Sequence, residues 1–177
     1  MKYDHVMIDL ETLGTTADAV ILSIGAVKFN LDGAIDDAAF YGSISIDSCL
    51  QYGRRISEDT LIWWMQQSRE AQAVFNEPKE TLDTVLGNFC DWFDNPDACA
   101  WANGPDFDLP MIAHAIAGCP DMEVPWKFWN SRCMRTYKSL PFAARVPKPA
   151  NDHNALRDAV NQARYIQAVH AAMKVAA

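Results

Sequence analysis

The first apolar stretch of the chain, residues 5–12, contains two carboxylates, Asp9 and Glu11, within a pattern that otherwise predicts a buried β-strand. Alternate side chains of a strand share a face, so the two carboxylates are expected to point the same way, about 6 to 7 Å apart along the backbone. Burying two like charges together is costly unless a cation compensates them. The stretch therefore predicts a site for a divalent metal ion. If the strand ended near Met7 instead, both acids would be solvated loop residues.

Two later segments carry groups that could complete such a site. Asp106 and Asp108 follow a short apolar segment, residues 99–102, and open the next predicted helix. Junctions between a strand and a helix are where α/β proteins place their sites. His153 stands at the mouth of the last predicted helix, and Asp158 lies about one turn inside it. A lone histidine is more often structural than catalytic, but the neighbours of His153 favour catalysis.

The elements that must position these groups begin with strands. After the apolar run at residues 5–12, residues 19–30 are rich in Val, Ile and Phe, and residues 40–46 alternate between apolar and polar. Residues 31–33 carry a hairpin signal between the second and the third segment. These segments predict an antiparallel meander.

The rest of the chain mixes helices and strands. The expected helices are one at 58–67, one with Pro78 in its first turn that continues to Phe93, and one that residues 106–108 open and Gly118 stops. Strands are expected at 99–102 and 126–133, followed by a short helix near Tyr137. A last, long helix is expected to follow Asn151 or Asp152 and to run toward Met173. Residues 145–151, which include two prolines, are expected to form a lid or loop, and Asn151 or Asp152 can cap the last helix.

Composition limits the classes of function. The length of 177 residues fits one domain, and the net charge of −8 disfavours a surface that grips duplex phosphate over many contacts. Bound Mg²⁺ or Mn²⁺ would cancel part of that charge, so a small nucleic-acid footprint stays compatible. The five cysteines show no C-x-x-C spacing, which indicates reduced thiols rather than a zinc site or a disulfide framework. No apolar run is long enough to span a membrane and no signal-peptide pattern is present, so a cytoplasmic protein is expected.

These residues together resemble the three exonuclease motifs of the DEDDh group of DnaQ-like 3'-5' exonucleases. The motifs are Asp9-Leu10-Glu11-Thr12, then Phe107-Asp108, then His153 followed by Asp158. The similarity spans nearly the whole chain in the family's order, and the form of its middle motif is similar to small phage and prophage members. It implies a single exonuclease domain over residues 1–177 with an RNase H-like α/β fold. In that fold a mixed five-stranded sheet of three antiparallel and two parallel strands is flanked by helices.

The middle motif departs from the commoner form of the family, which has His-Asn and two residues before Phe-Asp. Here Ala102 precedes Asn103, and one extra residue makes Asp106 a competitor of Asp108. We assign Asp108 because it follows Phe107 and because the helix is expected to begin there. Asp106 would then be a capping or outlying acid.

The resemblance implies a two-metal mechanism for phosphodiester hydrolysis, because two Mg²⁺ or Mn²⁺ ions about 4 Å apart can activate water and neutralise developing negative charge. Asp9 is implied to bridge both ions, and Glu11 and Asp158 to complete one ion's site. Asp108 is implied to hold the second ion mainly through water. His153 is implied to be the general base that takes a proton from the attacking water.

The implied substrate is the 3' end of single-stranded DNA or RNA. The implied products are nucleoside 5'-monophosphates. The backbone of Thr12, Leu13 and Gly14 is implied to lie beside the terminal nucleotide, and Asn103 and Phe107 are further candidates for substrate binding. Aromatic side chains such as Phe107 can stack bases without reading sequence. A monomer and a homodimer are both compatible with the sequence, and no membrane partner is expected.

Three other functions fit parts of the pattern. A metal-dependent nucleotidase would hydrolyse small phosphate esters, and a non-catalytic nucleic-acid-binding module would hydrolyse nothing. An endonuclease of the wider RNase H-like class would cut a circular single strand. The presence of all five motif residues argues against a decayed site.

Overall fold

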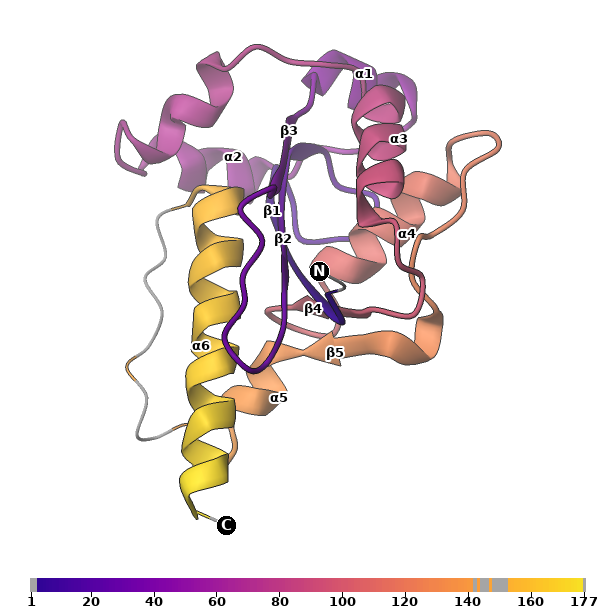
Figure 1. Ribbon diagram of the computed structural model, residues 1–177. Helices are drawn as coiled ribbons and strands as arrows, with labels where there is room; N and C mark the ends of the chain where they lie inside the picture. Colours follow the sequence, from indigo (N-terminus) through magenta and orange to yellow (C-terminus); the bar gives the residue numbers. More distant parts are fainter. Residues whose placement is uncertain (1–2, 142, 144–146, 148–152, 177) are drawn as a thin grey trace.

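Five strands form one mixed sheet, in the order β3-β2-β1-β4-β5, in the computed structural model (Figure 1). β1 pairs antiparallel with β2, and β2 pairs antiparallel with β3. β4 runs parallel to β1, and β5 runs parallel to β4. The predicted sheet of three antiparallel and two parallel strands is therefore confirmed. The strands are β1 (His5–Thr12), β2 (Ile21–Phe29), β3 (Phe40–Ser43), β4 (Cys99–Ala102) and β5 (Ser131–Cys133).

The structure describes residues 3–141, 143, 147 and 153–176. The loop expected at 145–151, apart from Pro147, and the caps expected from Asn151 or Asp152 lie outside these residues. At the start of the last helix, the side-chain oxygen of Asn154 accepts a hydrogen bond from the backbone N–H of Arg157 at 3.1 Å, which caps the helix. Across the described residues, no helix combines the length and the apolar character needed to cross a membrane.

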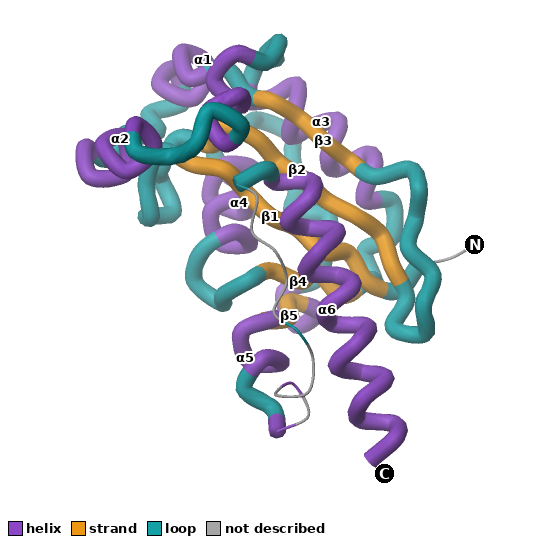
Figure 2. Tube along the Cα trace, turned by 90° about the vertical axis from the view of Figure 1, so that its left-hand side faces the viewer, coloured by secondary structure: helices purple, strands orange, loops and turns teal. Residues whose placement is uncertain are grey.

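Helices cover both faces of the sheet (Figures 1 and 2). α6 (Ala155–Ala176) lies along one face, with α5 (Met134–Lys138) beside it, and α3 (Leu82–Phe93) and α4 (Asp108–Ala117) cover the other. The shorter elements are α1 (Ile46–Gln51), α2 (Glu58–Met65) and the 3-10 helices η1 (Ala71–Asn76) and η2 (Phe128–Asn130).

The alternation of β1 decides which face carries the acids. Val6, Ile8 and Leu10 point toward α3 and α4 and join the larger hydrophobic cluster. Met7 points the other way and packs in the cluster that includes Ile166 of α6. Asp9 and Glu11 continue the face of Met7, so the carboxylates lie on the side that α6 covers.

A close approach at Gly25 brings the first turn of α6 to these acids. Gly25 pairs with Asp9 across β1 and β2. A Cβ atom built on Gly25 would lie 2.2 Å from the backbone carbon of Ala155 and 2.2 Å from the backbone nitrogen of Leu156. Ala155, Ala159 and Ala163 are fully buried, so small side chains on the helix complete the fit to the sheet.

Three predicted strands are longer than the observed ones, and the strand expected at 19–30 differs only at its ends, since β2 spans Ile21–Phe29. The strand expected at 126–133 is wrong in its first half, because residues 128–130 form η2 and only the last three residues pair with β4. The strand expected at 40–46 ends at Ser43, because Ser45 caps α1 by accepting a hydrogen bond from the backbone N–H of Ser48. The sequence patterns did not predict α1.

The contact at Gly25 gives a stability prediction. Gly25→Ala should lower the free energy of unfolding by about 2 kcal/mol or more, because the new methyl group meets backbone atoms of α6 that must shift. Gly87→Ala is the matched control, since its Cβ would lie at an ordinary 3.6 Å from Met122 inside α3. That variant should be more stable by up to about 1 kcal/mol. Urea unfolding of both variants checks this, and equal stabilities would contradict the contact.

Candidate active site

A cavity of about 600 Å³ lies against the last residues of β1. Its walls come from β1, the loop after β4, the first residue of α4, α5 and the start of α6. Segments far apart in the sequence therefore meet at the end of a central strand, the usual location of a site in α/β folds. The lining residues are Asp9, Leu10, Glu11, Asn103, Gly104, Pro105, Asp106, Phe107, Asp108, Arg135, Lys138, His153 and Gln162.

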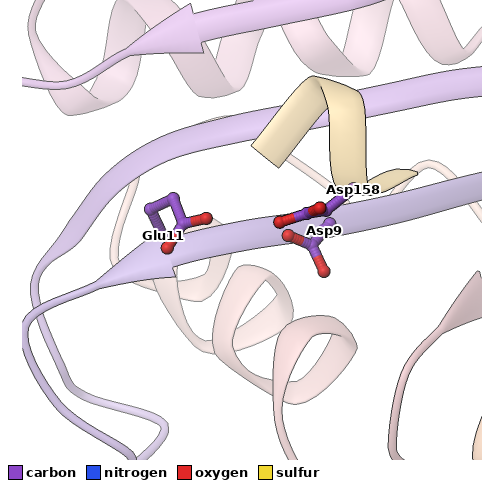
Figure 3. Close-up of side chains that lie close together, drawn as sticks. All are labelled: Asp9, Glu11 and Asp158. Atoms are coloured by element: carbon purple, nitrogen blue, oxygen red, sulfur yellow. The ribbon is translucent and has the colours of Figure 1, made fainter. Parts of the chain in front are cut away.

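Three carboxylates converge at the wall of this cavity: Asp9 and Glu11 line it, and Asp158 lies beside them. Asp9, Glu11 and Asp158 each place one oxygen within 4.8 Å of the others'. Asp158 comes from the first turn of α6 and lies over Asp9, with Glu11 farther along β1 (Figure 3). Glu11 and Asp158 are buried, and Asp9 is partly open. Oxygen ligands at this spacing suit a hard divalent cation.

The structure separates the two acids of the middle motif. Asp108 is 3% exposed, and its Oδ1 accepts a hydrogen bond from the backbone N–H of Leu10 at 3.1 Å. This bond fixes the Asp108 carboxylate against β1, within the cavity but outside the group of three. Asp106 also lines the cavity but is exposed on the loop before α4.

The environment of the cavity disfavours the ionised form of these carboxylates. Burial, followed by repulsion from Asp158 and Asp108, raises the pKa of Glu11 to about 8. Burial raises the pKa of Asp108 to about 7, against hydrogen bonds that lower it. The pKa of Asp9 lies well above its ordinary value because of desolvation and then of repulsion from Asp108 and Glu11. Arg135 lowers the pKa of Asp108, yet the pKa of that acid still lies above its ordinary value. A bound metal ion would compensate the remaining charge.

Gln162 is a site residue that the sequence patterns missed. Its Nε2 donates a hydrogen bond to Oδ1 of Asp9 at 2.7 Å, and its buried Oε1 has no hydrogen-bond partner in the described part of the chain. An orphaned acceptor beside carboxylates fits a hydrated cation, whose water molecules donate hydrogen bonds. The available signal was its spacing, because Gln162 follows Asp158 by one helical turn and shares its face.

His153 reaches the cavity from just before α6, with its backbone in the left-handed region at φ 51°. Its ring lies 5.0 Å from that of Trp63, edge to face. Of the two adjacent tryptophans, Trp64 is buried and donates a hydrogen bond to the carbonyl of Thr12 at 2.8 Å, whereas Trp63 is 40% exposed. The exposed ring therefore packs against the histidine while its neighbour anchors the end of β1.

A second cavity, of about 390 Å³, adjoins the first and shares Leu10, Glu11 and Phe107 with it. Thr12 and Gly14 also line this second cavity. Leu13 does not line either cavity: its side chain is 1% exposed in the core, and its backbone N–H donates to Val20. Asn103 and Phe107, the other two candidates for substrate binding, line the first cavity.

Two cations at the rim of the main cavity were also missed from the sequence. Arg135 donates a hydrogen bond to the carbonyl of Asn103 at 3.1 Å, and Lys138 donates one to the side-chain oxygen of Asn103 at 3.4 Å. Both cations come from α5, directly after the last strand. They give an otherwise acidic cavity one basic side.

The fold and this acidic cavity define a DnaQ-like 3'-5' exonuclease. Residues 4–170 match the family model described as the 3'-5' exoribonuclease Rv2179c-like domain, and the chain belongs to that family. The resemblance inferred from the three sequence motifs is thereby confirmed.

Relatives outside the family model agree with this class. The chain is 28% identical over 155 residues to an exodeoxyribonuclease of Enterobacteria phage T4, covering 73% of this chain and 68% of that protein. It matches E. coli Exonuclease I in complex with a dT13 oligonucleotide with a TM-score of 0.68 at 13% identity, covering 99% of this chain and 42% of that one. It matches Exonuclease I from Methylocaldum szegediense with a TM-score of 0.64 at 12% identity, covering 93% and 39% of the two chains. The likeness to both structures is one of fold and confirms the RNase H-like architecture, and this chain spans less than half of their length.

The raised pKa values predict how pH and metal affect stability. Folded Glu11, with its pKa of about 8, keeps its proton where the unfolded residue, near its ordinary 4.5, has lost it. The free energy of unfolding of the metal-free protein should therefore fall as pH rises between these values. Mg²⁺ or Mn²⁺ should restore stability, with the largest rise in Tm above about pH 8, because metal binding requires the deprotonated acids.

Thermal unfolding in chelator and in metal, over a series of pH values, measures this effect. Glu11→Gln should be more stable than the parent in chelator at high pH and should gain less from metal. A metal-induced rise in Tm that is independent of pH and unchanged by Glu11→Gln would contradict a metal site at these acids.

The position of Asp108 predicts the outcome of a paired substitution. Asp108→Asn should lower nuclease turnover by about 10²-fold, the usual scale for one electrostatic group in an active site. Asp106→Asn, on the exposed loop, should change turnover by less than about 2-fold, since surface charges contribute little. Initial rates on a labelled single strand measure both, and a larger loss at Asp106 would reverse the assignment.

Proposed function

We propose that this chain is a metal-dependent enzyme that hydrolyses phosphodiester bonds from the 3' end of single-stranded DNA or RNA and releases nucleoside 5'-monophosphates. The observation that carries the proposal is the convergence of Asp9, Glu11 and Asp158, at the wall of a cavity that Asp9, Glu11 and His153 line. A family of 3'-5' exoribonuclease domains and an exodeoxyribonuclease relative support the reaction and leave both sugars within the substrate class.

Two divalent ions, Mg²⁺ or Mn²⁺, are the proposed cofactors. Asp9, Glu11 and Asp158 would hold one, and Asp108 together with Asp9 would hold the other. When bound, such ions supply positive charge to the phosphoryl oxygens and the departing 3'-oxygen, and they increase the acidity of the attacking water. The orphaned Gln162 acceptor and the raised pKa values of the acids support this fit.

The chain's own residues hold the site in shape. Gln162 fixes one oxygen of Asp9, and the backbone of Leu10 fixes one oxygen of Asp108, so neither carboxylate needs to reorient when substrate arrives. We propose His153 as the general base, which takes the proton of the attacking water at a ring nitrogen. Trp63 packs edge-on against that ring and limits its rotation.

The second cavity is the proposed place of the terminal nucleotide. It shares Glu11 with the acid group, so a nucleotide held there would present its phosphate to the acids. Phe107 and Trp63 offer aromatic faces for base stacking without sequence preference. The net charge of −8 supports a single strand with few contacts rather than an extended duplex.

The unit proposed to perform this reaction is one exonuclease domain over residues 1–177, acting in the cytoplasm.

α2 leaves Leu61, Ile62 and Met65 exposed. A second copy packed on that helix would give the homodimer that the sequence also allows.

The test is a time course on 5'-labelled DNA and RNA single strands of one sequence, in Mg²⁺, in Mn²⁺ and in chelator. The expected result is a ladder that shortens from the 3' end only with metal, and that disappears in Asp158→Asn. Absence of cleavage with either metal would leave a nucleotidase or a binding module. Cleavage of a circular single strand would indicate an endonuclease.

A substitution of the proposed base separates its role from metal binding. His153→Ala should lower turnover by about 10²-fold, the usual contribution of a general base. The variant should keep the metal-induced rise in Tm, because His153 is not among the proposed metal ligands. Unchanged turnover across a pH series would remove His153 from the mechanism.

A further inference from the structure

One segment of the chain has a charge opposite to the rest. Residues 124–151 contain six Lys or Arg and no Asp or Glu, whereas the remaining residues contain nine Lys or Arg and all 23 Asp and Glu. Aromatic residues, including Phe128, Trp129 and Tyr137, alternate with these cations. A basic stretch interleaved with aromatics is typical of surfaces that bind single-stranded nucleic acid.

The structure places the first half of this segment at one edge of the sheet, where η2, β5 and α5 follow one another (Figure 1). We call the exposed and partly exposed cations and the two exposed aromatic residues of this part the basic strip. Phe128 is 82% exposed and Trp129 is 60% exposed, with their rings edge to face at 4.8 Å. Lys127 lies 5.8 Å from the centre of the Trp129 ring. The strip consists of Lys127, Phe128, Trp129, Arg132, Arg135 and Lys138.

The basic strip is continuous with the acid cavity. Arg135 and Lys138 line that cavity directly. Pro105 lines both the cavity and a neighbouring groove of about 380 Å³, which Phe128 and Arg132 also line. A strand with its 3' end at the acids can therefore pass over Pro105 onto the strip.

Two arginines of the strip keep their charge available for an anionic partner. Arg132 donates its hydrogen bonds to the carbonyls of Trp129 and Ser131, and Arg135 donates to the carbonyl of Asn103. Among the residues that the structure describes, neither arginine forms a salt bridge.

We propose that the basic strip binds the single strand on the 5' side of the scissile bond. Arg132 and Arg135 contact phosphates, and bases stack on Phe128 and Trp129. This inference rests on the proposed function, since the direction of the strand follows from hydrolysis at the 3' end. The occupant is assigned by charge, because this edge is basic in a chain that is acidic elsewhere.

Binding without turnover provides the test. The parent is Asp158→Asn, and the probes are 5'-labelled oligo(dT) of three and of twelve nucleotides, followed by fluorescence anisotropy. Twelve nucleotides lie within the range that single-strand surfaces occupy, and three lie below it. Adding Phe128→Ala and Trp129→Ala together should weaken binding of the twelve-mer by about tenfold or more. The ratio of the Kd for the three-mer to the Kd for the twelve-mer should shrink accordingly.

Matched controls separate the strip from general surface effects. Tyr52→Ala removes an exposed aromatic side chain at the end of α1 and should leave twelve-mer binding unchanged. Arg132→Ala should reduce the slope of log K against log salt by about 0.7, the value for one phosphate contact on a single strand. Lys174 lies on the last turns of α6 and pairs with Asp32. Lys174→Ala should not change that slope.

The outcomes for the strip and for the enzyme are distinguishable. If strip variants bind the twelve-mer as tightly as their controls do, the proposal that the strip binds the single strand is wrong, and this edge is left for a protein partner. This conclusion does not depend on the result of the nuclease assay. A tenfold loss supports the strip even if the unsubstituted chain hydrolyses neither DNA nor RNA. In that case the proposed function fails and nucleic-acid binding remains.

Discussion

The contact between the backbone of Gly25 and the first turn of α6 is the constraint on which the site depends. Asp9 and Glu11 belong to a strand, and Asp158 belongs to a helix at the other end of the chain. Their carboxylates meet only because the helix backbone approaches the sheet without an intervening side chain. The buried alanines of α6 maintain that approach along the next turns. Small residues thus set the geometry of charged ones.

The same contact holds carboxylates close together, and their mutual repulsion costs electrostatic free energy. Four acids, Asp9, Glu11, Asp108 and Asp158, lie at or beside one cavity. Burial and repulsion from neighbouring carboxylates raise the pKa of Asp9 and Glu11, and burial raises that of Asp108. Two hydrophobic clusters, one on each face of the sheet, stabilise the fold against this repulsion. A site of this kind is preorganised for cations because the protein framework, rather than the metal, holds the ligands together.

Sequence patterns predicted the parts of the site that follow from local periodicity. Asp9 and Glu11 share a face because β1 alternates, and Asp108 begins α4 as expected. Gln162, Arg135 and Lys138 were missed because their roles depend on which helix lies beside which strand. The first half of the expected strand at 126–133 was wrong because apolar character alone does not distinguish an exposed aromatic pair from a buried strand. The backbone of Leu13 stays a predicted neighbour of the substrate, while its side chain packs in the core.

β5 is only three residues long and forms one outer edge of the sheet. An unpaired edge can recruit strands from other molecules, and proteins limit this by keeping edge strands short and placing charges on them. Arg132 lies at the middle of β5 and is exposed. Its charge therefore discourages edge-to-edge aggregation of the chain, so the arginine protects solubility whether or not a ligand is bound.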